Sequence, residues 1–302
     1  MRLAAGTGSL ALVALACACG GHSGPAGFWT ARSSGTSNSL FAVASGSQVV
    51  AVGALGKIHT SPDGIVWQSR TSGASVHLYG VAASPGAFVA VGDLGTIVAS
   101  PDLATWTRRT SGTSNLLRGV AWTGSQFVAV GNSGAILTSP DGTAWTTQTS
   151  GTANDLYGAV ARSDLIVATG AGGTILTSPT GAAWTPRSSA GGATLRAVVW
   201  SGAQFLVVGD IGGNGLTPNV QTSFDAMTWT AQRSAIGNAM YGAAWSGMQF
   251  VTVGQFSQTQ TSTDGIAWTY RSFTTPNDLE AVAWSGARFV AVGQAGTIYT
   301  AP

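Results

Sequence analysis

The chain offers few groups that could perform acid–base chemistry. The first candidate to consider is Glu280, its only glutamate. Hydrolysis of a glycosidic bond needs two carboxyl groups that face each other across a cleft, separated by about 5 to 10 Å. The aspartates that could face Glu280 are Asp93, Asp155, Asp210 and Asp278. A glycan-binding or glycoside-hydrolysing protein is therefore an alternative that the residue types leave open.

Other common chemistries lack their residues. The three histidines, His22, His59 and His77, are isolated in the sequence and do not form the clustered ligands of a zinc site. The only lysine, Lys57, is not part of a glycine-rich phosphate-binding loop. Both cysteines precede residue 20, so the rest of the chain has no cysteine nucleophile. We expect no metal, no cofactor and no enzymatic activity.

The sequence contains an internal repeat, and the fold that it determines must position these candidate residues. Seven tryptophans recur at separations of 38, 39, 39, 39, 45 and 39 residues. They are Trp29, Trp67, Trp106, Trp145, Trp184, Trp229 and Trp268. Each unit has the same four segments in the same order, and in the third unit these are residues 117–121, 127–131, 134–139 and 140–146. Because a repeat of this length determines the whole fold, it outweighs any local motif.

The repeated segments predict strands. Short β-branched and aromatic runs bounded by Gly, Pro, Asp and Ser are typical of strands joined by tight turns, and four strands per unit make one blade. The fourth segment, such as residues 107–111, is polar and is expected at the outer edge. The last unit supplies three strands ending at Thr300, while 28–32 is a lone strand of the fourth type. We therefore predict an all-β, seven-bladed β-propeller of four-stranded antiparallel blades over residues 28–302, closed by its N-terminal strand.

One turn recurs with a distinctive composition. The segment 61–67 reads Ser-Pro-Asp-Gly-Ile-Val-Trp and is echoed at 139–145 and 262–268, with degenerate copies at 100–106, 178–184 and 223–229. An Asp at the start of a tight turn accepts backbone N–H bonds, and Gly adopts positive φ. We predict that five aspartates hold these turns and bind no metal: Asp63, Asp102, Asp141, Asp225 and Asp264.

This turn resembles the Asp-box repeat of sialidase-like propellers, a group that includes the photosystem II assembly-factor propellers. The resemblance covers residues 28–302 and implies that the Asp-box turns share one face while the opposite face holds the site. A sialidase would also need an arginine triad and a tyrosine paired with a glutamate. The chain lacks the Arg-Ile-Pro segment typical of bacterial sialidases, so the resemblance favours a non-catalytic member.

Comparing the repeats with one another identifies a variable position directly after the first-strand Leu or Met. It is occupied by Phe41, Tyr79, Arg118, Tyr157, Arg196, Tyr241 and Glu280. A fully dry position could not accept both Arg and Glu, because an unpaired buried charge is costly. We predict that these seven residues, called the mouth ring below, surround the mouth of the central channel. Aromatic and Arg side chains anchor protein interfaces and stack on sugars, although amphipathic packing around water would use the same residues.

The fifth unit is longer than its neighbours by six residues. The extra length falls within 209–221, in the loop between the second and third strands, on the face of the mouth ring. Insertions on a rigid scaffold often carry specificity, but neutral drift would produce the same pattern.

The N-terminus has the layout of a secretory signal. Residues 1–19 place one Arg before an apolar run that ends in small residues. The segment resembles a bacterial lipoprotein signal, with Cys19 as the favoured lipidation site, Cys17 as the alternative, and simple cleavage without lipid as a third reading. Residues 20–27 are expected to be a flexible tether.

Charge limits the partners. The chain has 13 basic and 11 acidic residues, and removal of Arg2 with the leader leaves 12 − 11, or +1. A nucleic-acid-binding protein needs a clustered basic surface. We therefore expect an exported, monomeric scaffold, periplasmic or on the surface of a bacterial cell, that contacts the membrane only through its lipid and binds another envelope protein.

Overall fold

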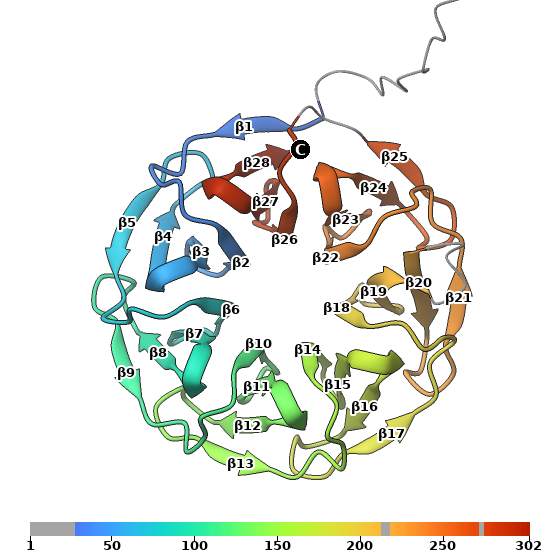
Figure 1. The fold of residues 1–302 in the computed structure, drawn as a ribbon, viewed down its shortest axis with the longest axis horizontal. Coiled ribbons are helices and arrows are strands. Elements are labelled where there is room, and N and C mark those ends of the chain that lie inside the picture. Colours follow the sequence, from blue (N-terminus) through green and yellow to red (C-terminus); the bar gives the residue numbers. More distant parts are fainter. Residues whose placement is uncertain (1–27, 213–217, 272–274) are drawn as a thin grey trace, which may run out of the picture.

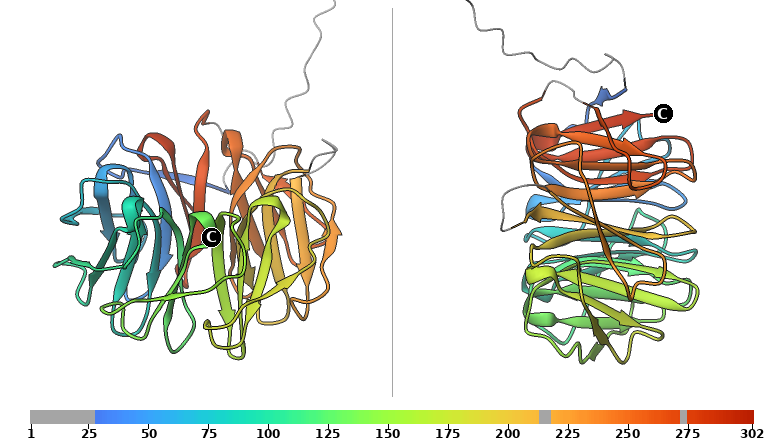
Figure 2. Two further views of the ribbon diagram at one scale, coloured as in Figure 1. Left: turned by 60° about the horizontal axis from the view of Figure 1, so that its bottom comes forward. Right: turned by 90° about the vertical axis from the view of Figure 1, so that its right-hand side faces the viewer.

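Seven separate four-stranded antiparallel sheets are arranged radially in the computed structural model (Figure 1). The structure describes residues 28–212, 218–271 and 275–302. Seen from the side, the sheets form a disc whose two faces carry the turns (Figure 2). None of the helical segments in the described part of the chain is long and apolar enough to cross a membrane. The predicted seven-bladed β-propeller is confirmed.

The first four blades follow the chain from the inside of the ring outwards. Blade 1 comprises β2 (Leu40–Ser45), β3 (Val49–Gly53), β4 (Lys57–Ser61) and β5 (Gln68–Thr71). Blade 2 comprises β6 (Leu78–Ala83), β7 (Phe88–Gly92), β8 (Ile97–Ser100) and β9 (Thr107–Arg109). Blade 3 comprises β10 (Leu117–Trp122), β11 (Phe127–Gly131), β12 (Ile136–Ser139) and β13 (Thr146–Gln148). Blade 4 comprises β14 (Leu156–Arg162), β15 (Leu165–Gly170), β16 (Ile175–Ser178) and β17 (Thr185–Arg187).

The remaining three blades complete the ring. Blade 5 comprises β18 (Leu195–Trp200), β19 (Phe205–Ile211), β20 (Pro218–Ser223) and β21 (Thr230–Gln232). Blade 6 comprises β22 (Met240–Trp245), β23 (Phe250–Gly254), β24 (Thr259–Ser262) and β25 (Thr269–Arg271). Blade 7 comprises β26 (Leu279–Trp284), β27 (Phe289–Gly293), β28 (Ile298–Ala301) and β1 (Thr30–Arg32). Every strand of the seven sheets lies between Thr30 and Ala301.

Short 3₁₀ turns join the second and third strands of blades 1, 2, 3, 4, 6 and 7. They are η1 (Ala54–Gly56), η2 (Asp93–Gly95), η3 (Asn132–Gly134), η4 (Ala171–Gly173), η5 (Gln255–Ser257) and η6 (Gln294–Gly296). In each inner pair the start of the first strand lies opposite the end of the second, as Leu117 lies opposite Gly131. The 3₁₀ turns therefore lie on the face where the first strands begin, and the Asp-containing turns lie on the other face.

The N-terminal strand closes the ring as predicted. In β1, Thr30 pairs with Thr300 and Arg32 pairs with Ile298 of β28. Trp29, only 8% exposed, donates from its indole Nε1 to Thr259 Oγ1 in blade 6, at 3.2 Å. Blade 7 thus joins the two ends of the chain and leaves no open edge between them.

The core lies between the blades. The second strand of each blade is almost wholly buried, and its Phe is fully buried in four of them: Phe127, Phe205, Phe250 and Phe289. Burying one such side chain contributes about 1.5–3 kcal/mol. The inner strands approach each other so closely that a Cβ on Gly119 would lie 2.5 Å from the carbonyl oxygen of Tyr157 in blade 4. Glycine is required there because no side chain fits.

The aspartates of the recurring turn accept backbone N–H bonds, as predicted. Asp63 Oδ1 accepts the backbone N–H groups of Ile65 (2.8 Å) and Val66 (3.2 Å), and these bonds hold the pKa of Asp63 below its ordinary value. Backbone N–H groups are also bound by Asp102, Asp141, Asp225 and Asp264. Within the described residues no cluster of acids, His and Cys could hold a metal ion.

The degenerate copies keep the turn without its usual residues. Leu103 and Ala226 stand where Gly64 stands in blade 1, and they adopt φ of 64° and 62°. A non-glycine residue pays about 1–2 kcal/mol for this left-handed conformation. In blade 4, Thr180 replaces Asp and accepts one long bond, from the N–H of Ala182 at 3.4 Å.

The predicted outer strand over 107–111 is too long. Strand β9 ends at Arg109. The chain turns directly afterwards because Ser111 Oγ bonds to the carbonyl of Thr113 at 3.0 Å and Gly112 adopts a φ of 77°. Side-chain bonds of this kind compete with the strand ladder.

Candidate functional site at the ring mouth

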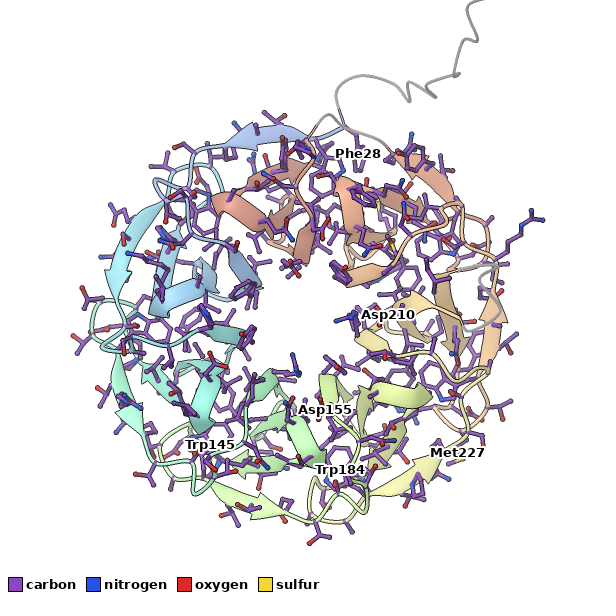
Figure 3. The ribbon with its side chains drawn as sticks, in the orientation of Figure 1. Phe28, Trp145, Asp155, Trp184, Asp210 and Met227 are labelled. Carbon is purple, nitrogen blue, oxygen red and sulfur yellow. The ribbon has the colours of Figure 1, made fainter. Side chains whose placement is uncertain are left out.

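Each residue of the mouth ring is the extra residue of a β-bulge. In blade 3, Leu117 pairs with Gly131 and Gly119 pairs with Val130, so Arg118 has no cross-strand partner. The same shift skips Phe41, Tyr79, Tyr157, Arg196, Tyr241 and Glu280 in the other blades. A bulge changes the direction of its side chain. All seven side chains are half-buried, and the inner strands that carry them surround the axis of the ring (Figure 3).

On blades 1 and 2 the mouth ring is aromatic. Phe41 and Tyr79 are stacked, with centroids 5.0 Å apart and ring planes inclined by 21°. His77, just before β6, meets both rings edge-on, 5.8 Å from Phe41 and 6.0 Å from Tyr79. The imidazole Nδ1 accepts the backbone N–H of Leu55 in blade 1 at 3.1 Å. These contacts join the two blades and fix the orientation of the imidazole.

On blades 3 to 6 the mouth ring alternates cations with aromatic rings. The guanidinium carbon of Arg118 lies 4.7 Å from the ring centroid of Tyr157. That of Arg196 lies 5.5 Å from the Tyr157 centroid and 5.0 Å from that of Tyr241. Cation–π contacts of this length contribute about 0.5–1 kcal/mol each at exposed sites. Four of the seven predicted residues therefore form one continuous series.

Each of the two arginines is also held by the residue directly after the second-strand glycine of its own blade, which is Gly131 in blade 3 and Gly209 in blade 5. Arg118 Nε donates to Asn132 Oδ1 at 2.7 Å. Arg196 forms an ion pair with Asp210, including a 3.0 Å bond from Nη2 to Oδ2. Burial opposes the charged form of Arg196, but the hydrogen bond and charge of Asp210 outweigh burial and raise the pKa of Arg196. In Figure 3, Asp210 lies at the inner edge of its blade.

Glu280 is a half-buried carboxyl group with Asp278 nearby. Burial raises the pKa of its carboxyl group, and the nearby Asp278 carboxylate raises it further, while Gln294 and Arg196 oppose both effects. Burial also raises the pKa of Tyr241. Glu280 therefore holds a proton to higher pH than an ordinary glutamate.

The aspartates that could pair with Glu280 are engaged in structural bonds. Asp155 Oδ1 accepts the N–H of Ser133 (2.9 Å), and Asp278 Oδ1 accepts that of Phe256 (2.8 Å). Each bond fastens the start of one blade to the 3₁₀ turn of the preceding blade. Asp93 Oδ2 accepts the N–H of His77 at 3.3 Å, and Asp210 is paired with Arg196. Asp93, Asp155 and Asp278 therefore bind backbone N–H groups, and Asp210 balances the charge of Arg196.

Three exposed apolar side chains on the same face were not predicted from the sequence. Leu55, Leu94 and Phe256 are the middle residues of η1, η2 and η5, and they are 58%, 71% and 62% exposed. Their φ values are 54°, 55° and 52°, a conformation that strains bulky residues and is often found at functional sites. Glycine occupies the equivalent position in blade 4, as Gly172. Comparing this position across the repeats would have identified the three residues.

The insertion of blade 5, the two cysteines and two of the histidines, all noted in the sequence, are not part of the mouth ring. The insertion of blade 5 extends β19 and β20, with Ile211 opposite Pro218, while residues 213–217 lie outside the described residues. Cys17, Cys19 and His22 also lie outside them. His59 is 2% exposed, and its ring nitrogens have no hydrogen-bond partner in the described part of the chain. Burial, assisted by the charge of Lys57, lowers the pKa of His59, so this side chain is a buried neutral group.

Comparison with solved structures gives the fold independent support. YCF48 from Cyanidioschyzon merolae matches with a TM-score of 0.72 and 15% identity, over 91% of this chain and 98% of that chain. YCF48 bound to D1 peptide matches with a TM-score of 0.74 and 16% identity, over 91% and 95%. The WD40 β-propeller domain of Doa1 matches with a TM-score of 0.71 and 12% identity, over 89% and 96%.

These likenesses are structural and distant. No protein-family model and no curated protein matches the sequence. At these identities the solved structures establish the propeller fold, and fold alone does not determine function.

Proposed function

We propose that this chain is a non-catalytic scaffold that binds another protein through the face carrying the mouth ring. The observation that carries the proposal is the bulge repeated in all seven blades, because it frees one variable side chain per blade from the ladder at the same height. A bulge is a device that re-aims side chains at functional rims. The residues so presented are four aromatics, two arginines and one glutamate.

The chemistry of this face suits a protein surface with two different parts. Blades 1 and 2 present the stacked pair Phe41 and Tyr79 on the face that also carries the exposed Leu55 and Leu94. Blades 3 to 5 present Arg118 and Arg196. Aromatic and Arg anchors supply most of the energy at protein interfaces. A protein partner is also in keeping with the fold likeness to YCF48 bound to D1 peptide.

The engaged aspartates support a non-catalytic role. Asp155 and Asp278 accept backbone bonds from neighbouring blades, and Asp210 neutralises Arg196. Freeing any of them for acid–base work would break a contact between blades or an ion pair. We therefore rank a glycoside hydrolase below a binding scaffold.

The proposed location is the cell envelope. Its support is the leader at residues 1–19 with Cys19, or Cys17, as the lipidated residue. Full-length protein should sediment with membranes, and Cys19→Ser should release it if Cys19 carries the lipid, with Cys17→Ser as the matched comparison. Sedimentation that is indifferent to both substitutions would contradict lipidation.

The partner site is tested by substitution on this face. A pull-down from native envelopes with the Arg118→Ala/Arg196→Ala variant should lose partner at least about tenfold, as expected for interface hot spots. The control is Arg108→Ala/Arg233→Ala, which removes the same charge from two exposed positions on the outside of the ring. Equal recovery of partner by both variants would contradict the proposal.

A further inference from the structure

The outer strands carry a regular ladder of hydrogen bonds that had no counterpart in the sequence analysis. In six of the seven blades the third residue of the outer strand is an Arg or Gln that donates to a Thr on the strand beside it. Nε of Arg32 donates to Thr300 Oγ1 at 2.9 Å, and Nε of Arg70 donates to Thr60 Oγ1 at 3.0 Å. Similar bonds are made by Gln148, Arg187, Gln232 and Arg271. A glutamine therefore makes the same bond as an arginine, without the charge.

Arginine is not evenly distributed along this ladder. It occupies the third outer position in four consecutive blades, as Arg271, Arg32, Arg70 and Arg109 in blades 6, 7, 1 and 2. Blades 3 and 5 have glutamine at this position, with Arg187 between them. None of the seven outer strands contains an acidic residue. One side of the rim is therefore the more basic.

The acids near this side of the rim are few. Asp264 and Asp63 lie in the turns of blades 6 and 1 on one face of the disc. Blade 7, between them, has no such turn because the two ends of the chain meet there, and it carries Arg32 and Arg288. The basic side of the rim therefore extends from blade 6 through blades 7 and 1 to blade 2, whose outer strand carries both Arg108 and Arg109.

The chain also enters the ring at this place. Residue 28 lies at blade 7, where the guanidinium carbon of Arg271 is 5.5 Å from the ring centroid of Phe28. Figure 1 shows β1 beside β25 and β28 at the rim. The segment 1–27, which contains Cys17 and Cys19, is therefore joined to the ring within this basic side.

We propose that the rim over blades 6, 7 and 1 is a docking surface for an anionic phospholipid bilayer, contacted by Arg271, Arg32 and Arg70. In the ladder each of these half-buried arginines uses Nε to bind Thr. The proposed contacts with phosphate oxygens would use the terminal NH₂ groups, of which Arg70 Nη2 also donates to Gln68. A basic residue near an anionic leaflet contributes about 1 kcal/mol. The disc would then stand edge-on to the membrane, with the mouth ring accessible from the side.

The proposed docking surface adds a contact between protein and membrane to the attachment that a lipid on Cys19 or Cys17 would provide. A basic patch beside a lipid chain is the usual second signal that makes membrane attachment firm and oriented. That this surface meets a membrane in the cell rests on the proposed export. Binding of the protein to vesicles does not depend on export. Equal partner recovery by the Arg118→Ala/Arg196→Ala variant and its control, with vesicle binding as predicted, would refute the proposed function alone. Partner loss as predicted, without the predicted vesicle binding, would refute the docking surface alone.

The test uses a chain beginning at residue 20, which contains all 28 strands of the ring. Binding to phosphatidylcholine vesicles with and without phosphatidylglycerol is measured by sedimentation at low ionic strength, where exposed charges are weakly screened. Wild-type protein should bind only the vesicles that contain phosphatidylglycerol. Arg32→Gln should weaken binding about fivefold, and the triple variant with Arg70→Gln and Arg271→Gln about a hundredfold.

The matched control is Arg187→Gln in blade 4, on the opposite side of the rim. It removes the same charge, and Gln148 and Gln232 show that glutamine preserves the bond to Thr. Arg187→Gln should change vesicle binding less than about twofold, because blade 4 lies across the ring from the docked edge and does not contact the bilayer (Figure 1). Equal weakening by Arg32→Gln and Arg187→Gln, binding to neutral vesicles, or no binding at all would overturn the proposal. Equal melting temperatures of the variants exclude misfolding as the cause.

Discussion

Arg118 in blade 3 lies over the ring of Tyr157 in blade 4, with its guanidinium carbon 4.7 Å from the ring centroid. The contact joins two blades at the mouth, and Arg196 approaches the same ring from blade 5 at 5.5 Å. Tyr157→Leu should therefore lower the free energy of unfolding by about 1–2 kcal/mol, since it removes two cation–π contacts. Tyr157→Phe keeps the ring and should remain close to wild type in urea unfolding. An equal loss of unfolding free energy in Tyr157→Leu and Tyr157→Phe would show that the cation–π contacts with this ring do not stabilise the protein.

The turn of blade 4 tests the role of the aspartates. Thr180→Asp should stabilise the protein by about 1 kcal/mol at neutral pH, because the carboxylate would accept backbone N–H groups that Thr180 does not bind well. The pKa of such an aspartate falls below its ordinary value of 3.8, as it does for Asp63. Its contribution is therefore present above that value and lost as the pH falls through the lower folded-state pKa.

Urea unfolding at neutral pH and at about pH 3 measures this effect. Thr180→Asn is the control, because its amide can hold the turn but does not titrate. A gain for Thr180→Asp that is the same at both pH values would contradict the electrostatic part of the explanation.

Blade 2 has a gap in its ladder of rim bonds. Ala99 stands where the other blades have Thr, and within the described residues the buried Nε of Arg109 has no hydrogen-bond partner. Ala99→Thr should supply the missing acceptor and raise the free energy of unfolding by about 1 kcal/mol. Ala99→Val has the same shape without the hydroxyl. The account is wrong if valine stabilises as much as threonine.

Because the inner strands approach each other closely, we expect two glycine-to-alanine substitutions to destabilise the protein by different amounts. A Cβ on Gly119 would lie 2.5 Å from the carbonyl oxygen of Tyr157, whereas a Cβ on Gly158 would lie 3.1 Å from that of Arg196. Gly119→Ala should cost about 1–3 kcal/mol, and Gly158→Ala should cost less. Thermal unfolding of the two variants measures the difference, and the reverse order would mean that the strands can separate without cost.

Much of the fold follows from the repeat alone. The spacing of the tryptophans gave the number of blades, and the lone strand before residue 33 predicted the closure that the pairing of Thr30 with Thr300 confirms. The turn aspartates were predictable because an Asp two residues before a free N–H has a local mechanism. Such features depend on neighbours in the sequence.

The site was less accessible to sequence reasoning. The bulge at Arg118 depends on how two strands register, and the bond from Ser133 to Asp155 crosses between blades, so neither has a local signal. Leu94 adopts positive φ although its residue type disfavours that conformation, because the surrounding turn imposes it. The ion pair of Arg162 with Asp164 on the opposite face was also missed. That the mouth ring binds a partner stays a prediction.

The most direct test of the central claim is site-specific photo-crosslinking in native envelopes. A photoreactive residue at Leu94, 71% exposed on the face of the mouth ring, is compared with one at Val66, 63% exposed on the face of the Asp-containing turns. The account predicts a protein adduct from position 94 that disappears in the Arg118→Ala/Arg196→Ala background, and none from position 66. Adducts from position 66 alone, or the same adducts from both positions, would contradict it.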